Sequence, residues 1–229
     1  MDHFRHIYTH QAADYHRLIT PEDYTGNLLP AMQRVTDFRG KRVVDLGTGT
    51  GRLPLLVSEQ AAQVIGLDLH AAMLQENQHQ RNQVNGRWGL TQGDMRALPL
   101  SGGWADVVTA AWCISHLRTW YADDWQRQIG RVLREMDRVL APDGVMIIIE
   151  TLTTGSLTPA PPSPALAEYY DWLEGEWGFV RQTIRTDYQF ATVEEAIRRT
   201  GFFFGEDLAH AIRAQGWAQL PEWTGVWSK

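Results

Sequence analysis

The chain has 229 residues, of which 44% are hydrophobic and 21% charged, so its length and composition fit one sizeable soluble domain. A net charge of −6, with only two lysines (Lys41 and Lys229), argues against a dedicated nucleic-acid binder. No apolar run approaches the roughly 20 residues that cross a bilayer, and residues 1–10 lack a signal-peptide core. The single cysteine cannot form an internal disulfide, so we expect a cytoplasmic protein, monomeric or homodimeric, without membrane or nucleic-acid partners.

The first 40 residues are expected to be helical. Thr20 to Asp23 resembles a helix start, because a capping hydroxyl precedes a proline and two acids. Pro30 is then expected to kink or restart the helix.

From residue 40 onward, short apolar runs alternate with helical patterns, which is typical of βαβ units and a parallel sheet. The predicted strands cover 42–46, 64–68, 88–91, 106–112 and 145–149. Helices are predicted over about 70–84 and 123–140, and Ala141 to Gly144 is expected to stop the second. These patterns predict a doubly wound α/β fold with a mostly parallel sheet.

Two patterns follow the fifth strand. Residues 151–180 open with a proline-rich loop and continue as an amphipathic helix with Tyr169, Tyr170 and Leu173 on one face. A strand within 181–190, a helix opened by the capping box Thr192–Glu195, and a last strand at 223–227 complete the prediction.

The most informative motif joins the first strand to a glycine-rich turn, Asp45-Leu46-Gly47-Thr48-Gly49-Thr50-Gly51, followed by a helix. Glycines let the backbone bend sharply and approach a ligand closely. Dinucleotide-binding folds use the wider spacing G-x-G-x-x-G, whereas here Arg52 stands where a third small residue is needed. Asp45 suits a cationic ligand better than a pyrophosphate, although it could also only cap the turn.

With these residues, positions 40–150 resemble the class I S-adenosylmethionine-dependent methyltransferases, particularly the small-molecule branch that includes quinone-biosynthesis enzymes. The resemblance implies a Rossmann-like methyltransferase fold, S-adenosylmethionine as cofactor, and methyl transfer to a small-molecule acceptor. Residues 1–229 would form a single methyltransferase domain. Its parts would be an N-terminal helical cap (1–40), a cofactor-binding core (41–150), a lid insertion (151–180) and the C-terminal part of the sheet (181–229).

The same resemblance implies which residues hold the cofactor. The turn would cradle the methionine part, and Asp68, at the end of the second strand, would accept both ribose hydroxyls. Asp94 would face the adenine amine, although Gly-Asp is also ordinary loop chemistry. Met73 is expected to pack within its helix rather than bind cofactor. The full predicted set is Asp45, Gly47, Thr48, Gly49, Gly51, Asp68, Leu69, Asp94, Met95 and Ala111.

His116 is the first candidate for a general base, because it follows the fourth strand, where strand ends face the ligand crevice. It could instead bond a nearby carbonyl or only contact cofactor. Glu150, at the end of the fifth strand, is a second candidate that we expect to be structural. Cys113 is expected to be a packing residue. No metal is expected.

Residues 151–180 are predicted to form a mobile roof over the acceptor site, as insertions here do in similar enzymes. Their acids, Glu168, Asp171, Glu174 and Glu176, would suit an amine acceptor, or would be only the solvated face of a helix. Tyr8, Tyr15 and Tyr24 could close over the cofactor from the other side. The alternatives left open are an NAD-dependent oxidoreductase, a non-catalytic cofactor-binding protein, and a methyltransferase acting on RNA or protein.

Overall fold

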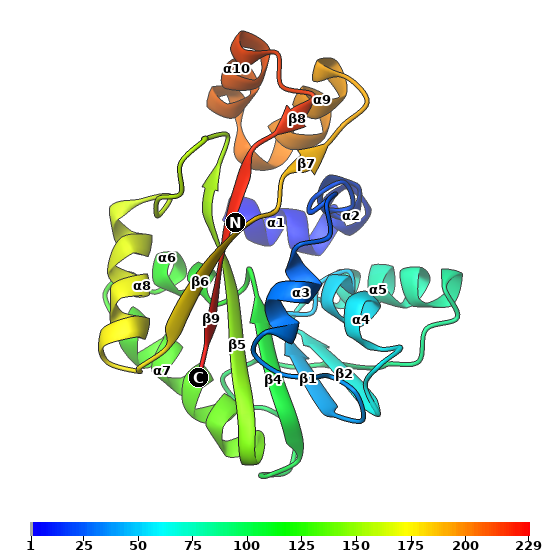
Figure 1. Ribbon diagram of the computed structural model, residues 1–229, viewed down its shortest axis with the longest axis vertical. Helices are drawn as coiled ribbons and strands as arrows, with labels where there is room; N and C mark the ends of the chain where they lie inside the picture. The colour runs from blue at the N-terminus through cyan, green and yellow to red at the C-terminus, as the bar shows by residue number, and fades with distance from the viewer. Residues whose placement is uncertain (1) are drawn as a thin grey trace.

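The computed structural model describes residues 2–229, so Met1, the first residue of the predicted cap, lies outside the described residues. Its centre is a seven-stranded sheet of order β3-β2-β1-β4-β5-β9-β6 (Figure 1). The strands are β1 (Arg42–Leu46), β2 (Gln63–Asp68), β3 (Gly89–Gln92), β4 (Ala105–Ala111), β5 (Leu140–Thr154), β6 (Val180–Arg185) and β9 (Glu222–Ser228). The first five are parallel to one another, whereas β9 runs antiparallel to both β5 and β6. The predicted mostly parallel sheet is confirmed.

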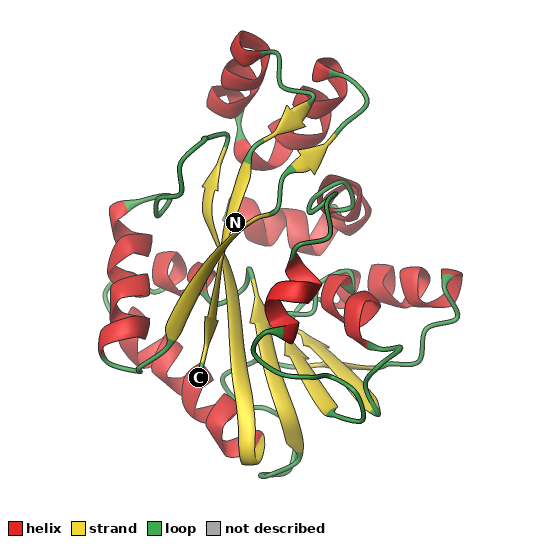
Figure 2. Ribbon diagram, viewed as in Figure 1, coloured by secondary structure: helices red, strands yellow, loops and turns green. Residues whose placement is uncertain are grey.

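Helices cover both faces of this sheet (Figures 1 and 2). On one face lie α3 (Leu28–Gln33), α4 (Arg52–Val57) and α5 (Ala71–Gln83); on the other lie α6 (Ser115–Trp120), α7 (Trp125–Val139) and α8 (Pro164–Gly175). The apolar stripe of α7, including Ile129, Leu133 and Met136, is fully buried against the sheet. The chain order reverses between β1 and β4, and at such a switch point ligands bind beyond the carboxyl ends of the strands.

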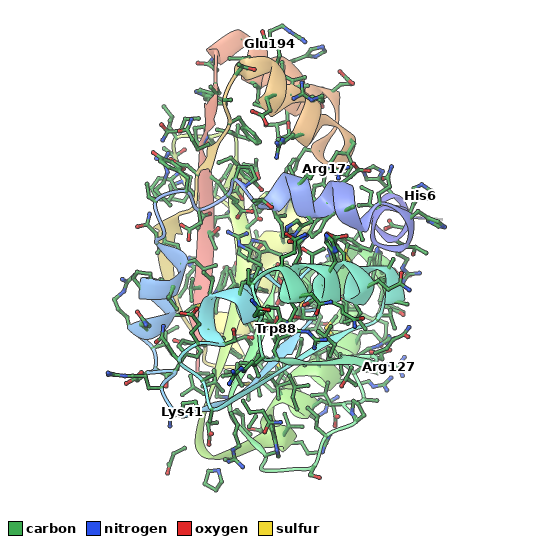
Figure 3. The ribbon with its side chains drawn as sticks, turned by 90° about the vertical axis from the view of Figure 1, so that its right-hand side faces the viewer. His6, Arg17, Lys41, Trp88, Arg127 and Glu194 are labelled. Atoms are coloured by element: carbon green, nitrogen blue, oxygen red, sulfur yellow. The ribbon has the colours of Figure 1, made fainter. Side chains whose placement is uncertain are left out.

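Two N-terminal helices, α1 (His3–His10) and α2 (Ala12–Ile19), lie between α5 and the C-terminal helices, as Figure 3 shows around the labelled Arg17. No helix starts at Thr20, so that prediction is wrong. Asp23 adopts a positive φ of 56°, which breaks the helical path. Its carboxylate instead accepts the backbone N–H groups of Asn27 and Leu28 at the start of α3, where Pro30 lies in the first turn.

A small unit that the sequence reasoning missed interrupts the sheet between β6 and β9. It contains β7 (Tyr188–Gln189), α9 (Val193–Phe204), α10 (Glu206–Gln215) and β8 (Gln219–Leu220), and stands above the sheet in Figure 1. The predicted capping box is present, since the Thr192 hydroxyl accepts the N–H of Glu195. The strand predicted within 181–190 is divided, because β6 joins the main sheet and β7 pairs only with β8.

The segment predicted as a lid also divides into two parts. Tyr169, Tyr170 and Leu173 of α8 are buried in the main core, so this helix is a layer of the fold. The loop before it, residues 155–163, is largely exposed. The expected turn at 141–144 is a bulge within β5, where Ala105 faces Leu140 and Val107 faces Val145. Within residues 2–229, every helix is too short or too polar to cross a membrane.

Candidate active site

A pocket of about 430 Å³ lies at the switch point, within the usual range for small-molecule sites. It adjoins a smaller compartment at the ends of β2 and β3, and seven residues line both: Tyr8, Tyr15, Gly47, Gly49, Ala111, Trp112 and His116. Helices α1 and α2 roof both compartments, and Phe203 and Phe204 of α9 help to close the larger one.

The glycine-rich turn forms one wall. Gly47 and Gly49 have positive φ angles of 60° and 52°, and both line the two compartments. A Cβ on Gly47 would lie 2.4 Å from the Cβ of Cys113, so only glycine fits there. Thr48 lines the larger compartment. Gly51 lines neither compartment; its φ of 99° instead turns the chain into α4.

A buried amide that the sequence reasoning missed holds this turn. Asn77 of α5 is fully buried and donates from Nδ2 to the Gly49 carbonyl at 3.1 Å. Its Oδ1 accepts the indole N–H of Trp88 at 2.8 Å, and the Trp88 side chain lies beneath α5 in Figure 3. A Cβ on Gly51 would come within 2.8 Å of Asn77 Oδ1. Glycine at position 51 therefore makes room for the residue that fixes Gly49.

Asp68 ends β2 and faces the smaller compartment. Its carboxylate accepts the backbone N–H of Gly49 at 2.9 Å and that of His70 at 2.8 Å. Both oxygens are thereby oriented while each keeps a free lone pair for a ligand. Leu69, which is about half exposed, lines the same compartment.

Asp45, at the floor of the larger compartment, is 2% exposed. Burial raises the pKa of its carboxyl to about 7, even though the Thr109 hydroxyl donates to it at 2.7 Å. A cationic ligand beside Asp45 would favour its ionised form.

Asp94 and Met95 line the smaller compartment near β3. Arg96 donates to both oxygens of the Asp94 carboxylate, from its backbone N–H and Nε to Oδ1 and from Nε and Nη2 to Oδ2, and these bonds hold the pKa of Asp94 below the usual value. Met73 is buried against Ile7 and Tyr8 of α1 and also touches this compartment.

His116 lies where the two compartments meet, next to Ala111. Its Nε2 is 2.8 Å from the Tyr8 hydroxyl, and its ring stacks on Trp120 with centroids 4.9 Å apart. Burial lowers the pKa of His116 to about 4, so the imidazole is neutral near pH 7. Burial also raises the pKa of Tyr8 well above its ordinary value, so the phenol keeps its proton.

Glu150, at the end of the parallel part of the sheet, also lines the larger compartment. It is 1% exposed and accepts both the backbone N–H and the hydroxyl of Ser115, at 2.9 and 2.8 Å. Burial raises its pKa to about 7. Glu150 therefore anchors the first turn of α6 next to His116, and it can exchange a proton near neutral pH.

An ion pair stands at the side of the larger compartment away from Asp68. Arg52 Nη1 is 2.8 Å from Glu22 Oε2, and the Glu22 side chain is 4% exposed. The Arg52 guanidinium lies over the Trp112 ring, 4.3 Å from its centroid. Tyr188 of β7 lies against Glu22. The sequence reasoning missed this cluster because its residues come from four segments that are distant in the sequence.

The remaining residues predicted to lie around the pocket differ in whether they line it. Tyr8 and Tyr15 line both compartments, whereas Tyr24 is exposed and lines neither. The acids of residues 151–180 also lie outside: Glu168 pairs with Arg118, and Glu174 accepts the Trp227 indole N–H. Cys113 is buried, and burial raises its pKa well above the ordinary value, which fits a packing role. Across residues 2–229, no His, Cys, Asp and Glu group is arranged to hold a metal ion.

Sequence comparison identifies relatives of the central region. A family model described as a methyltransferase domain matches residues 44–148. A malonyl-[acyl-carrier protein] O-methyltransferase of Legionella pneumophila is 29% identical over 144 residues, covering 61% of this chain and 46% of that protein. A demethylmenaquinone methyltransferase of Thermus thermophilus is 32% identical over 132 residues, which cover 57% of this chain and 53% of that protein. The chain thus spans about half the length of these curated relatives.

Solved structures share the fold over more of the chain. A phosphoethanolamine N-methyltransferase 2 of Haemonchus contortus, in complex with S-adenosyl-L-methionine, superposes with a TM-score of 0.59 at 17% identity, covering 100% of this chain and 59% of that one. A putative methyltransferase of Bacillus halodurans gives a TM-score of 0.58 at 14% identity, covering 89% and 96%. At these identities the likeness concerns the fold.

Proposed function

We propose that this chain, which belongs to the class I S-adenosylmethionine-dependent methyltransferases, transfers the methyl group of S-adenosylmethionine to a small-molecule acceptor. The observation that carries the proposal is that the two compartments lie side by side: Asp68 lines one, Glu150 lines the other, and Gly47, Gly49 and His116 line both. Cofactor and acceptor would occupy this space end to end.

The residues of the smaller compartment fit S-adenosylmethionine. Asp68 has oriented oxygens for two ribose hydroxyls, and Leu69 and Met95 offer apolar contact for the adenine. Asp94 already accepts hydrogen bonds from Arg96 at both oxygens, so an adenine amine there would share the carboxylate with Arg96. The bare backbone of Gly47 and Gly49 leaves room for the methionine part, with Thr48 alongside. Asp45 beneath would complement the ligand's positive charge, and Gly51 contributes by shaping the turn.

The bound cofactor supplies an electrophilic methyl group whose leaving group is a neutral thioether, so departure needs no acid. The protein's task is therefore to align the acceptor and, for a hydroxyl or protonated amine, to remove a proton. Ala111 would leave space for the transferred methyl beside His116. Neutral His116 would take the acceptor's proton at Nδ1, in the tautomer in which its Nε2–H donates to the Tyr8 hydroxyl and so fixes the ring. Glu150 would fix α6 through Ser115.

Purified protein is expected to release S-adenosylhomocysteine from S-adenosylmethionine with at least one member of a panel of hydroxylated and amine-bearing small molecules. His116→Asn should then lower kcat about 10²-fold or more, the usual contribution of a general base, while cofactor Kd changes little. Because the pKa of His116 is about 4, kcat should be nearly independent of pH from 5.5 to 8.

A rise in kcat through pH 7 would indicate a carboxyl that becomes ionised there, Glu150 or Asp45, and loss of that rise in Glu150→Gln but not in Asp45→Asn would assign the base to Glu150. A His116→Asn variant of full activity would remove His116 from the mechanism. A nucleic acid or protein acceptor, with no small-molecule turnover, would contradict the proposed substrate class.

The roof proposed for the acceptor site is reduced to the loop 155–163, in which Pro162 lines the larger compartment next to Leu166 in the first turn of α8. Backbone amides of this loop should exchange more slowly with solvent hydrogen when S-adenosylhomocysteine and an active acceptor are both bound than with either alone. Amides of Tyr169, Tyr170 and Leu173 in α8, whose side chains are buried in the core, serve as the internal reference. Full protection of the loop in the free protein would show a fixed element.

A further inference from the structure

The Glu22–Arg52 ion pair contains one hydrogen-bond acceptor and one donor that are unpaired in the part of the chain that the structure describes. Within residues 2–229, Glu22 Oε1 and Arg52 Nη2 are both buried and have no hydrogen-bond partner of good geometry, although Arg52 Nη1 and Glu22 Oε2 lie 2.8 Å apart. The Tyr188 hydroxyl approaches the Glu22 carboxylate without meeting that geometry. Buried donors and acceptors of native proteins are nearly always satisfied, so a vacant donor beside a vacant acceptor requires an explanation. Both residues line the larger compartment, although these two atoms are themselves covered, so a ligand there would reach them after a small shift of the side chains around them.

The surroundings of the pair are apolar. Leu18 and Ile19 of α2, and Phe203 and Phe204 of α9, line the same compartment, and Trp112 lies under the Arg52 guanidinium. Trp112 is held at a positive φ of 51°, a conformation uncommon for a bulky side chain. An acceptor with a flat apolar body would fill this space.

The charge of this corner is balanced without a ligand. Burial alone would lower the pKa of Arg52, but the charge of Glu22 outweighs it and raises that pKa, so the guanidinium is ionised. Glu222, next to this corner, is 1% exposed, and burial together with the charge of Glu22 raises its pKa well above the ordinary value. The raised pKa favours the uncharged form of Glu222. Burial raises the pKa of Glu22 as well, against the charge of Arg52, and within the ion pair Glu22 and Arg52 neutralise each other. A ligand with a net charge would therefore find no opposite charge here, and its burial away from water would be unfavourable.

We infer that the Glu22–Arg52 pair selects the acceptor by binding a neutral head group that presents a hydrogen-bond acceptor to Arg52 Nη2 and, beside it, a donor to Glu22 Oε1. A carboxamide has this arrangement; a carboxylate lacks the donor and an ammonium lacks the acceptor. The inference rests on the proposed function, because it takes the larger compartment as the acceptor site.

Three naphthalene probes with the same body test it: 2-naphthamide, 2-naphthoate and 2-naphthylmethylamine, titrated calorimetrically into the full chain saturated with S-adenosylhomocysteine. The amide should bind about tenfold or more tightly than either charged probe. Glu22→Gln keeps an oxygen for Arg52 but removes the compensating charge, so in this variant the carboxylate should become the tightest probe. Glu168→Gln, which changes a 58% exposed ion-pair partner outside the pocket, should keep the wild-type order.

Undetectable amide binding, or a wild-type preference for a charged probe, would overturn the inference. So would a folded Glu22→Gln variant that keeps the amide preference. If Glu22→Gln weakens S-adenosylhomocysteine instead and leaves the probe order intact, the pair belongs to the cofactor site. If Glu22→Gln fails to fold, the wild-type order decides. Failure of the wild type to bind S-adenosylhomocysteine would refute the proposed function itself, which is a separate result.

Discussion

Gly47→Ala is expected to destabilise the protein and to abolish or strongly weaken cofactor binding. An alanine at φ 60° carries the strain of the left-handed region, about 1–2 kcal/mol. Its Cβ would also lie 2.4 Å from Cys113 Cβ, an overlap that adds about 1–3 kcal/mol if the turn shifts to relieve it. Urea denaturation should therefore show a loss of about 2–5 kcal/mol in the free energy of unfolding.

Gly103→Ala is the matched control, because Gly103 has a similar φ of 69° but open space around its Cβ position. The Gly103→Ala variant should lose only the part of the unfolding free energy that comes from backbone strain, about 1–2 kcal/mol. Its affinity for S-adenosylhomocysteine should be unchanged. Equal losses of stability in the two variants would mean that the close approach to Cys113 has no energetic weight.

Asp68→Asn is expected to weaken S-adenosylhomocysteine binding by about 10- to 150-fold in a protein that remains folded. The amide keeps the shape of the side chain but removes the charge and one acceptor oxygen. Hydrogen bonds to charged groups contribute about 1.5–3 kcal/mol, and the ribose hydroxyls would lose such a partner. Calorimetry gives the dissociation constant directly.

Asp106→Asn provides the comparison, since Asp106 also accepts a backbone N–H, from Arg42 at 2.8 Å, but lies outside both compartments. Its cofactor affinity should equal that of the wild type. An unchanged dissociation constant in folded Asp68→Asn would reject the ribose role of Asp68.

The core of the fold could be predicted because its signals are local. The buried strand ending in Asp45 and the glycine run from Gly47 to Gly51 carry their meaning in adjacent residues, so strand, turn and helix are confirmed together. The Thr192–Glu195 box marks the start of α9 for the same reason. Periodicity along α7 identified its buried face.

What could not be predicted depends on contacts distant in sequence. The sequence pattern places Glu22 in the first turn of a helix. In the structure Asp23 has a positive φ that turns the chain, and Glu22 pairs with Arg52 in the interior. The sequence pattern places Asn77 on the polar surface of its helix. In the structure it is buried and hydrogen-bonded to Gly49 and Trp88. The apolar face of α8 indicated that the helix packs against other residues, but it did not indicate whether these line a pocket or belong to the core. In the structure they belong to the core.

The most direct test of the central claim is a calorimetric titration of the full chain with S-adenosylhomocysteine and, separately, with NAD. The account predicts saturable one-to-one binding of the sulfur ligand and no detectable heat from NAD, because the Asp45–Gly51 turn and Asp68 are placed for a nucleoside on a cationic or neutral amino-acid chain. Tight binding of NAD, with no response to S-adenosylhomocysteine or S-adenosylmethionine, would contradict it.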